Sequence, residues 1–378
     1  MPSAAFEKAL AESELQETTG VAEPGVVGPG RAGVLLYESH EGALTWHRPD
    51  DLALVDEAAL PGRIRRFVFD VVDRVVQAFE TRARPHRLRM FPDGGDVDLG
   101  GLAAAGRVLL LVHGTASTAG SAFGALPDSA LDRLVQRYGG RVVALEHPTI
   151  SVSPIDNVAW LAERLGTERV AVDLLAHSRG GLVSRLLAEQ PERTGGLFDT
   201  GRVVLVGTPN AGTALADEAR YGQLLDRFTT MADRLPDPLG GPILEVMLRL
   251  VQQVVVGALD GLDGLAAMDP DSPFLTEVLN TAGTKTDTDG WTAVGADYEP
   301  PPGSALARVA LDAGSDIVFA ARPNDLVVPT DGCYDVPCVP GFPIADRLVF
   351  AAEDGVDHNG YWRAPAFADL LDERLTGS

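Results

Sequence analysis

The pattern of hydrophobic and polar positions changes near residue 105. Beyond it, short continuous apolar runs alternate with stretches in which apolar residues recur at helical spacing. Continuous apolar runs of this length are typical of strands buried on both faces, as in parallel sheets. The alternation therefore predicts an α/β fold, in which a mostly parallel sheet carries helices on both faces. The expected strands occupy residues 107–114, 141–145, 169–178, 202–209, 291–296, 316–321 and 347–352.

The first 105 residues lack this alternation. The chain begins with charged residues mixed with Gly and Pro, which predicts a poorly ordered tail. Residues 33–38 and 43–47 are expected to be two strands around a turn. Apolar residues at i, i+3, i+4 and i+7 predict an amphipathic helix over residues 64–79. We therefore expect residues 1–105 to form an N-terminal extension packed on a main domain of residues 106–378.

A long insertion separates two of the expected strands. The residues between 209 and 291 have a mostly helical pattern, with a broad apolar face between Ile243 and Ala258. In open α/β sheets, loops at the carboxyl ends of the strands surround the ligand pocket. This position favours a helical cap at about residues 213–288, and extra core is the alternative.

Net charge narrows the classes of partner. The 378-residue chain carries a formal charge of −23, which disfavours binding to nucleic acid or to an anionic membrane surface. The longest apolar stretch, residues 243–259, is interrupted by polar and charged residues, so no stable membrane insertion is expected. The acidic N-terminus has no apolar signal-peptide core. We expect a cytoplasmic protein of undetermined oligomeric state.

Cysteine usage and glycine motifs argue against metals and cofactors. Cys333 and Cys338 are the only cysteines, and they lie five residues apart in a Pro-rich loop. Two thiols are expected there, with a local disulfide as the alternative. No Cys-rich zinc pattern, HExxH motif or phosphate-binding glycine loop occurs. We therefore expect neither a metal nor a cofactor.

The segment with the clearest chemical signal is VAVDLLAHSRGG, residues 170–181. An apolar run ends at Ala176-His177, and helical spacing begins directly after Ser178. A serine between small residues at a strand-to-helix junction is the nucleophile-elbow pattern, because the tight turn leaves little space beside it. The helix N-terminus that follows favours developing negative charge. The alternative is a serine that only caps an ordinary helix.

This segment resembles the nucleophile elbow of the α/β-hydrolase superfamily, particularly of bacterial lipases and esterases. Ala176 stands where that family usually has its first Gly, and Arg179 stands where an apolar residue is more common. The resemblance covers roughly residues 107–365. It implies that the His-Gly of LLLVHGTAST, residues 109–118, opens an oxyanion loop. The backbone N–H groups of Thr115 and Arg179 would then be the oxyanion donors.

The resemblance also implies the other two members of a catalytic triad. Asp325 follows the expected strand 316–321 where the family carries its acid, and Asp217 is the weaker alternative. His358 lies in a polar loop after the last expected strand, where the family carries its histidine. The order Ser178, Asp325, His358 matches the chain order of α/β-hydrolases. His113 is expected to shape the oxyanion loop rather than to act as the base.

Two further segments resemble lipases and GPI inositol-deacylase-like hydrolases: GTPNAGT at 207–213 and MDPDSPFLTEVLN at 268–280. The expected activity is hydrolysis of carboxylic esters, on a small-molecule or lipid ester, through an acyl-enzyme. A thioesterase, acyltransferase or serine peptidase would use the same triad. A non-catalytic interaction module is the alternative of another class. The net charge makes neutral esters the expected substrates. The Arg179 side chain could instead receive an acidic acyl group, and the alternative interpretation of Arg179 is a salt bridge on the helix surface.

Overall fold

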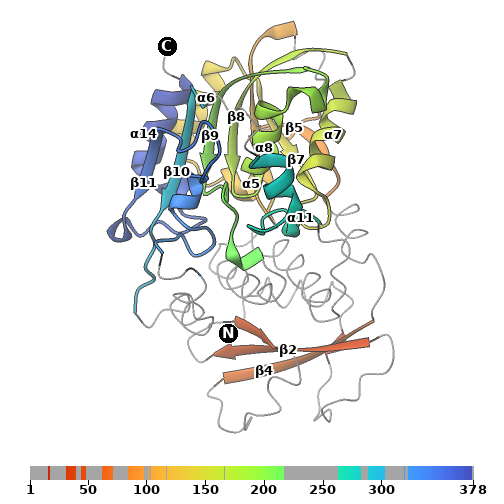
Figure 1. Ribbon diagram of the computed structural model, residues 1–378, viewed down its shortest axis with the longest axis vertical. Coiled ribbons are helices and arrows are strands. Elements are labelled where there is room, and N and C mark those ends of the chain that lie inside the picture. Colours follow the sequence, from red (N-terminus) through yellow and green to blue (C-terminus); the bar gives the residue numbers. More distant parts are fainter. Residues whose placement is uncertain are drawn as a thin grey trace. The chain divides into compact units, whose positions relative to one another are not determined.

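The computed structural model describes two compact units, which are treated separately below (Figure 1). One consists of Met1–Ala78, Asp217–Gly261 and Pro300–Ala321, and the other of Phe79–Ala216, Leu262–Glu299 and Arg322–Ser378. The described residues are 16–17, 31–39, 44–47, 62–70, 84–97, 101, 104–115, 117–165, 167–216, 263–281, 288–302, 319 and 322–376.

The larger unit contains a seven-stranded sheet in the order β11-β10-β9-β8-β6-β7-β5. All neighbouring strands are parallel except β5, which runs antiparallel to β7. The expected mostly parallel sheet is therefore confirmed, while the expected strand 316–321 falls almost wholly outside the described residues. The strands are β5 (Arg87–Met90), β6 (Val108–Val112), β7 (Val142–Glu146), β8 (Val170–His177), β9 (Phe198–Val206), β10 (Trp291–Ala296) and β11 (Asp346–Phe350).

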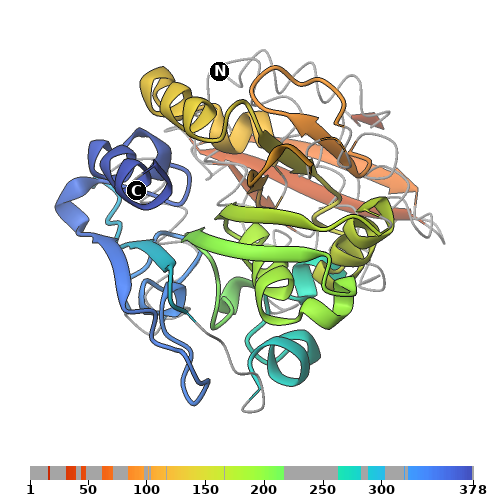
Figure 2. The ribbon, with the colours of Figure 1, turned by 90° about the horizontal axis from the view of Figure 1, so that it is seen from above.

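Helices cover both faces of this sheet (Figure 2). Helices α6 and α14 lie on one face and α7 and α8 on the other, as expected for strands that are apolar on both sides. The α-helices are α5 (Ala119–Phe123), α6 (Asp128–Arg137), α7 (Pro154–Leu165), α8 (Gly180–Glu189), α11 (Asp263–Ala266) and α14 (Pro365–Leu371). Single 3-10 turns span Pro191–Thr194, Ala214–Ala216, Asp331–Cys333, Ala352–Asp354 and Tyr361–Arg363, and π-helical turns span Phe274–Leu279 and Asp372–Thr376.

One hydrophobic core lies between the sheet and the α6–α14 face. Alternate residues of β6 contribute Leu109 and Leu111, because successive side chains of a strand point to opposite faces. Aromatic side chains from the C-terminal segment fill the same layer, and Trp362 packs edge-on against Phe123 with ring centroids 4.9 Å apart. This core fixes the segment after residue 358 against the sheet.

The smaller unit corrects one expectation. Its described part is a four-stranded sheet in the order β1-β4-β2-β3, formed by β1 (Gln16–Glu17), β2 (Arg31–Ser39), β3 (Leu44–His47) and β4 (Gly62–Asp70). The expected strand pair is confirmed as β2 and β3, but the expected helix over 64–79 is wrong for its first part. Residues 62–70 instead form a nine-residue antiparallel pairing with β2. A short apolar run fits either helical or strand periodicity. Pairing with β2 favours the strand, because it satisfies the backbone hydrogen bonds of both segments.

The expected domain boundary at residue 105 is also displaced. Strand β5 belongs to the main sheet, where Arg87 lies opposite Glu146 in β7. Its polar, arginine-containing sequence hides the strand from a search for apolar runs. Residues 217–262 of the expected cap lie outside the described residues. The cap, and the packing of the extension on the main domain, remain predictions. No helix within the described ranges is long and apolar enough to cross a membrane.

Helix α8 approaches the end of β6 so closely that Gly180 tolerates no side chain. A Cβ there would lie 2.5 Å from the carbonyl oxygen of His113 and would also collide with that of Val112. Because both obstacles are backbone, we expect Gly180→Ala to lower the free energy of unfolding by about 2 kcal/mol or more. Urea unfolding measures this. Gly95→Ala is the matched control, since a Cβ at Gly95 meets nothing within 4 Å; equal losses in both variants would contradict the prediction.

Candidate active site

Ser178 lies at the tip of a sharp turn between β8 and α8. Its φ is +54°, a left-handed conformation that costs a non-glycine residue about 1–3 kcal/mol. The turn is held by a hydrogen bond from the Ser178 N–H to the Val206 carbonyl, 2.8 Å long. Strand β8 is the central strand of the sheet, so the serine lies at the middle of its carboxyl edge.

His358 and Asp325 form a continuous hydrogen-bonded chain with this serine. His358 Nε2 lies 3.0 Å from Ser178 Oγ, and His358 Nδ1 lies 2.7 Å from Asp325 Oδ2. All three side chains are buried, with relative exposures of 3% or less. A carboxylate only accepts hydrogen bonds, so Nδ1 carries the proton and Nε2 is left to accept from the serine hydroxyl. This arrangement can remove the hydroxyl proton as the oxygen attacks.

The loops that carry Asp325 and His358 follow neighbouring strands. The Asp325 loop is tied to the end of β10 by Thr330 Oγ1, which donates to the Ala296 carbonyl at 2.6 Å. The His358 N–H donates to the Asp325 carbonyl at 3.0 Å. The two loops are therefore joined through backbone as well as side chains.

Four donors surround the Asp325 carboxylate. Oδ1 accepts from the N–H groups of Val327 and Val328 at 3.0 and 2.7 Å. Oδ2 accepts from the Tyr361 hydroxyl at 2.7 Å in addition to His358. Burial by itself raises the pKa of Asp325, but the charge of His358 and these hydrogen bonds outweigh it and hold the pKa below its ordinary value. The group is thus an ionised carboxylate inside the protein.

His177 holds the His358 loop through a backbone contact. Its Nε2 donates to the His358 carbonyl at 2.8 Å, and the two rings lie 4.9 Å apart. Burial lowers the pKa of His177 to about 3, with the proximity of His358 adding to the effect. His177 is therefore a neutral donor near neutral pH. Its own position, one residue before Ser178, couples the elbow to the His358 loop.

The expected oxyanion loop lies directly against the serine. A Cβ on Gly114 would come within 2.6 Å of the Ser178 Cβ, so only glycine allows this approach. His113 shapes the loop, because its Nδ1 bonds the Gly114 carbonyl at 3.0 Å and its Nε2 lies 3.3 Å from a carboxylate oxygen of Glu146. Burial raises the pKa of Glu146, but the pairing with His113 outweighs this and keeps it low. Thr115 follows this loop and Arg179 precedes α8; their roles as donors remain predictions.

The Arg179 side chain is fully buried, which overturns its interpretation as a surface salt bridge. Its Nε donates to the Gly264 carbonyl at 2.7 Å, and a terminal nitrogen donates to the Val152 carbonyl. The guanidinium thus ties the segment around α11 to the elbow, and we do not assign it to recognition of an acidic acyl group.

Other expectations have mixed outcomes. Asp217, the alternative acid, lies outside the described residues. Cys333 is buried and Cys338 exposed, both as free thiols, so the disulfide alternative is not realised. Sequence reasoning missed Tyr361 and His177 as partners of the site. Each is recognisable only through a long-range contact, since no spacing rule connects Tyr361 to Asp325.

Ser178 lies at the tip of a strand–turn–helix elbow on the central strand of a mostly parallel sheet, and the loops with Asp325 and His358 follow later strands. This arrangement defines the α/β-hydrolase fold. The model of a family described as Domain of unknown function (DUF7379) matches residues 75–376, and the chain belongs to this family. No curated protein matches the chain.

Solved structures provide distant likenesses. The mature lipase BlEst2 of Bacillus licheniformis is 17% identical, with 71% of this chain and 91% of the lipase covered and a TM-score of 0.39. EstA from Clostridium botulinum is 14% identical, with 72% of this chain and 87% of EstA covered and a TM-score of 0.45. At this distance the chemistry of the site rests on the chain's own residues.

Removing the Tyr361 hydroxyl should destabilise the ionised form of the buried Asp325 carboxylate. We expect Tyr361→Phe to lower the free energy of unfolding at pH 7 by about 1–3 kcal/mol, because a buried charged acceptor loses a donor. The pKa of Asp325 is lowered in the folded state, so its stabilisation is present above the unfolded pKa and is lost as pH falls. Acid unfolding should therefore begin at higher pH in the variant. Urea unfolding across pH tests this, with Tyr334→Phe as the control; equal effects would contradict the role of Tyr361.

His177 makes stability depend on pH in a defined window. Its pKa is about 6.5 when unfolded and about 3 when folded, so between these values the unfolded chain binds one more proton. Stability should fall as pH is lowered through that window, by up to about 1.4 kcal/mol per pH unit from this residue. Unfolding measured between pH 7 and 4 should show a slope smaller by about one proton in His177→Gln. An unchanged slope would show that His177 does not titrate this way.

Proposed function

We propose that the protein is a serine hydrolase that cleaves carboxylic esters through an acyl-enzyme. The observation that supports this is the unbroken chain of hydrogen bonds from Ser178 Oγ through His358 to Asp325. A positioned base beside a serine, itself oriented by a buried carboxylate, is the arrangement that activates a serine nucleophile. A binding module has no physical need for all three groups in this order.

In the proposed reaction, Ser178 Oγ attacks the ester carbonyl while His358 Nε2 takes its proton. Asp325 holds the imidazole tautomer and stabilises the imidazolium. The backbone N–H groups of Thr115 and Arg179 receive the developing oxyanion. His358 then protonates the leaving alcohol, and a water activated by His358 hydrolyses the acyl-enzyme. Ser178 and His358 return to their starting protonation states.

The first test is covalent labelling and turnover. A fluorophosphonate probe should label Ser178, and Ser178→Ala should lose labelling and lower kcat for a short-chain aryl ester by about 10⁴-fold or more. His358→Ala should also prevent labelling, because the hydroxyl loses its base. Mass spectrometry of the labelled peptide and ester hydrolysis measure both effects.

Ser184→Ala is the matched control, since Ser184 is a buried serine six residues later, on α8, and its hydroxyl has no hydrogen-bond partner in the described part of the chain. It should keep labelling and turnover. Label at another residue, or full turnover in Ser178→Ala, would overturn the proposal. Comparing ester, thioester and peptide substrates separates the activities that share such a triad.

A further inference from the structure

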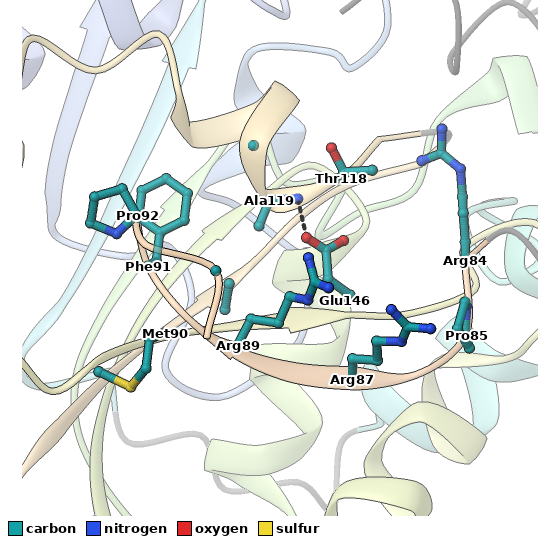
Figure 3. A pocket seen from close by; sticks show the side chains of 13 residues that line it. Arg84, Pro85, Arg87, Arg89, Met90, Phe91, Pro92, Thr118, Ala119 and Glu146 are labelled. Carbon is teal, nitrogen blue, oxygen red and sulfur yellow. Dashed lines mark hydrogen bonds between the residues drawn. The ribbon is translucent and has the colours of Figure 1, made fainter. Parts of the chain in front are cut away.

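A pocket in the larger unit has a volume of about 350 Å³ and lies beside the edge strand β5 (Figure 3). One wall is β5 with the turn that follows it, and the other is the start of α5. Its lining includes Arg84, Arg87, Arg89, Phe91, Pro92 and Glu146. Three arginines and a single carboxylate thus line one pocket, in a chain whose net charge is −23.

The arginines approach the pocket from one strand and its entry. Arg87 and Arg89 are two residues apart on β5 and so share a face, and Figure 3 shows Arg89 extending toward Glu146 and Arg87 extending toward Pro85. Arg84 closes one end, where its guanidinium donates to the carbonyl of Ser117. Arg84 is therefore fixed in place, and Arg87 and Arg89 are the two groups that a ligand could engage.

The nearby carboxylate is already bound by other groups. Glu146 accepts from the Ala119 N–H at 3.1 Å and pairs with His113 at 3.3 Å. Arg87 lies directly across the strand pair from Glu146, yet neither Arg87 nor Arg89 forms an ion pair within the described residues. Arg87 and Arg89 therefore line the pocket without an acidic partner among the described residues.

The simplest alternative is that these arginines only protect a sheet edge, where charged side chains discourage pairing with other strands. Arg87 is exposed and would fit that role. Arg89 does not, because its Nε is buried and has no hydrogen-bond partner among the described residues. The Nε is closed to solvent, so an anion in the pocket would meet the terminal guanidinium nitrogens of Arg89, which form no ion pair within the described residues.

We propose that this pocket binds a small organic anion whose carboxylate or phosphate group lies between Arg87 and Arg89. Guanidinium groups bind both kinds of oxyanion through charge-assisted hydrogen bonds. The apolar part of the ligand packs against Phe91 and Pro92, which extend the same wall. This site is independent of the proposed ester hydrolysis and is tested by binding alone.

Isothermal titration calorimetry with phenyl phosphate and benzoate tests the proposal on the full chain. At least one of these probes should bind with 1:1 stoichiometry, and the Arg87→Gln/Arg89→Gln variant should bind it at least about tenfold more weakly, because it loses both charged donors. Arg87→Gln alone changes only an exposed side chain and should still weaken binding severalfold. Arg169→Gln, a charge-matched substitution at an exposed arginine outside the pocket, should leave affinity within about twofold.

Two further probes define the ligand class. Benzyl alcohol, which lacks the anionic group, should bind at least tenfold more weakly than the bound anion. Inorganic phosphate should also bind more weakly, because it cannot use the apolar wall. The proposal is overturned if neither anion binds, if the arginine variants bind as wild type does, if Arg169→Gln weakens binding equally, or if benzyl alcohol or phosphate binds as tightly.

Discussion

The close approach of three backbone segments around Ser178 is the constraint on which the site depends. The end of β6, the elbow and the start of α8 meet where Gly114 and Gly180 leave no space for a Cβ. Because neither neighbour can move away without breaking the sheet, the serine keeps its φ of +54°. The same contacts bring the Gly114 loop and the start of α8 close to Ser178. Local strain and correct placement of the hydroxyl therefore have a single cause.

A buried carboxylate extends this constraint to the rest of the site. Asp325 is fully buried, and its charge is stable there because four donors from its own turn, from Tyr361 and from His358 surround it. These donors come from two loops, so satisfying one charge fixes both loops. His177 adds a third connection, from the residue before the serine to the His358 carbonyl. The position of His358 is thus fixed both by Asp325 and by His177.

Most of the larger unit could be predicted from the sequence because its signals are local. Buried parallel strands show themselves as apolar runs, and the Ser178 elbow needs small residues beside it. Asp325 and His358 required the family resemblance, since each alone is an ordinary loop residue. Strands β4 and β5 were missed because pairing with a distant strand, rather than local periodicity, decides their conformation. Tyr361 was missed because its hydroxyl meets a residue 36 positions away.

Net charge and local charge lead to different conclusions about ligands. A formal charge of −23 opposes an extended polyanion, because many phosphates must come close to many carboxylates at once. Charges on an exposed surface are screened beyond roughly 8–10 Å at ordinary ionic strength. A small anion beside β5 therefore responds mainly to charges close to it, and those that line the pocket, Arg84, Arg87, Arg89 and Glu146, sum to a positive value. The acidic composition thus disfavours nucleic acid as a partner but does not oppose a small anionic ligand in this pocket.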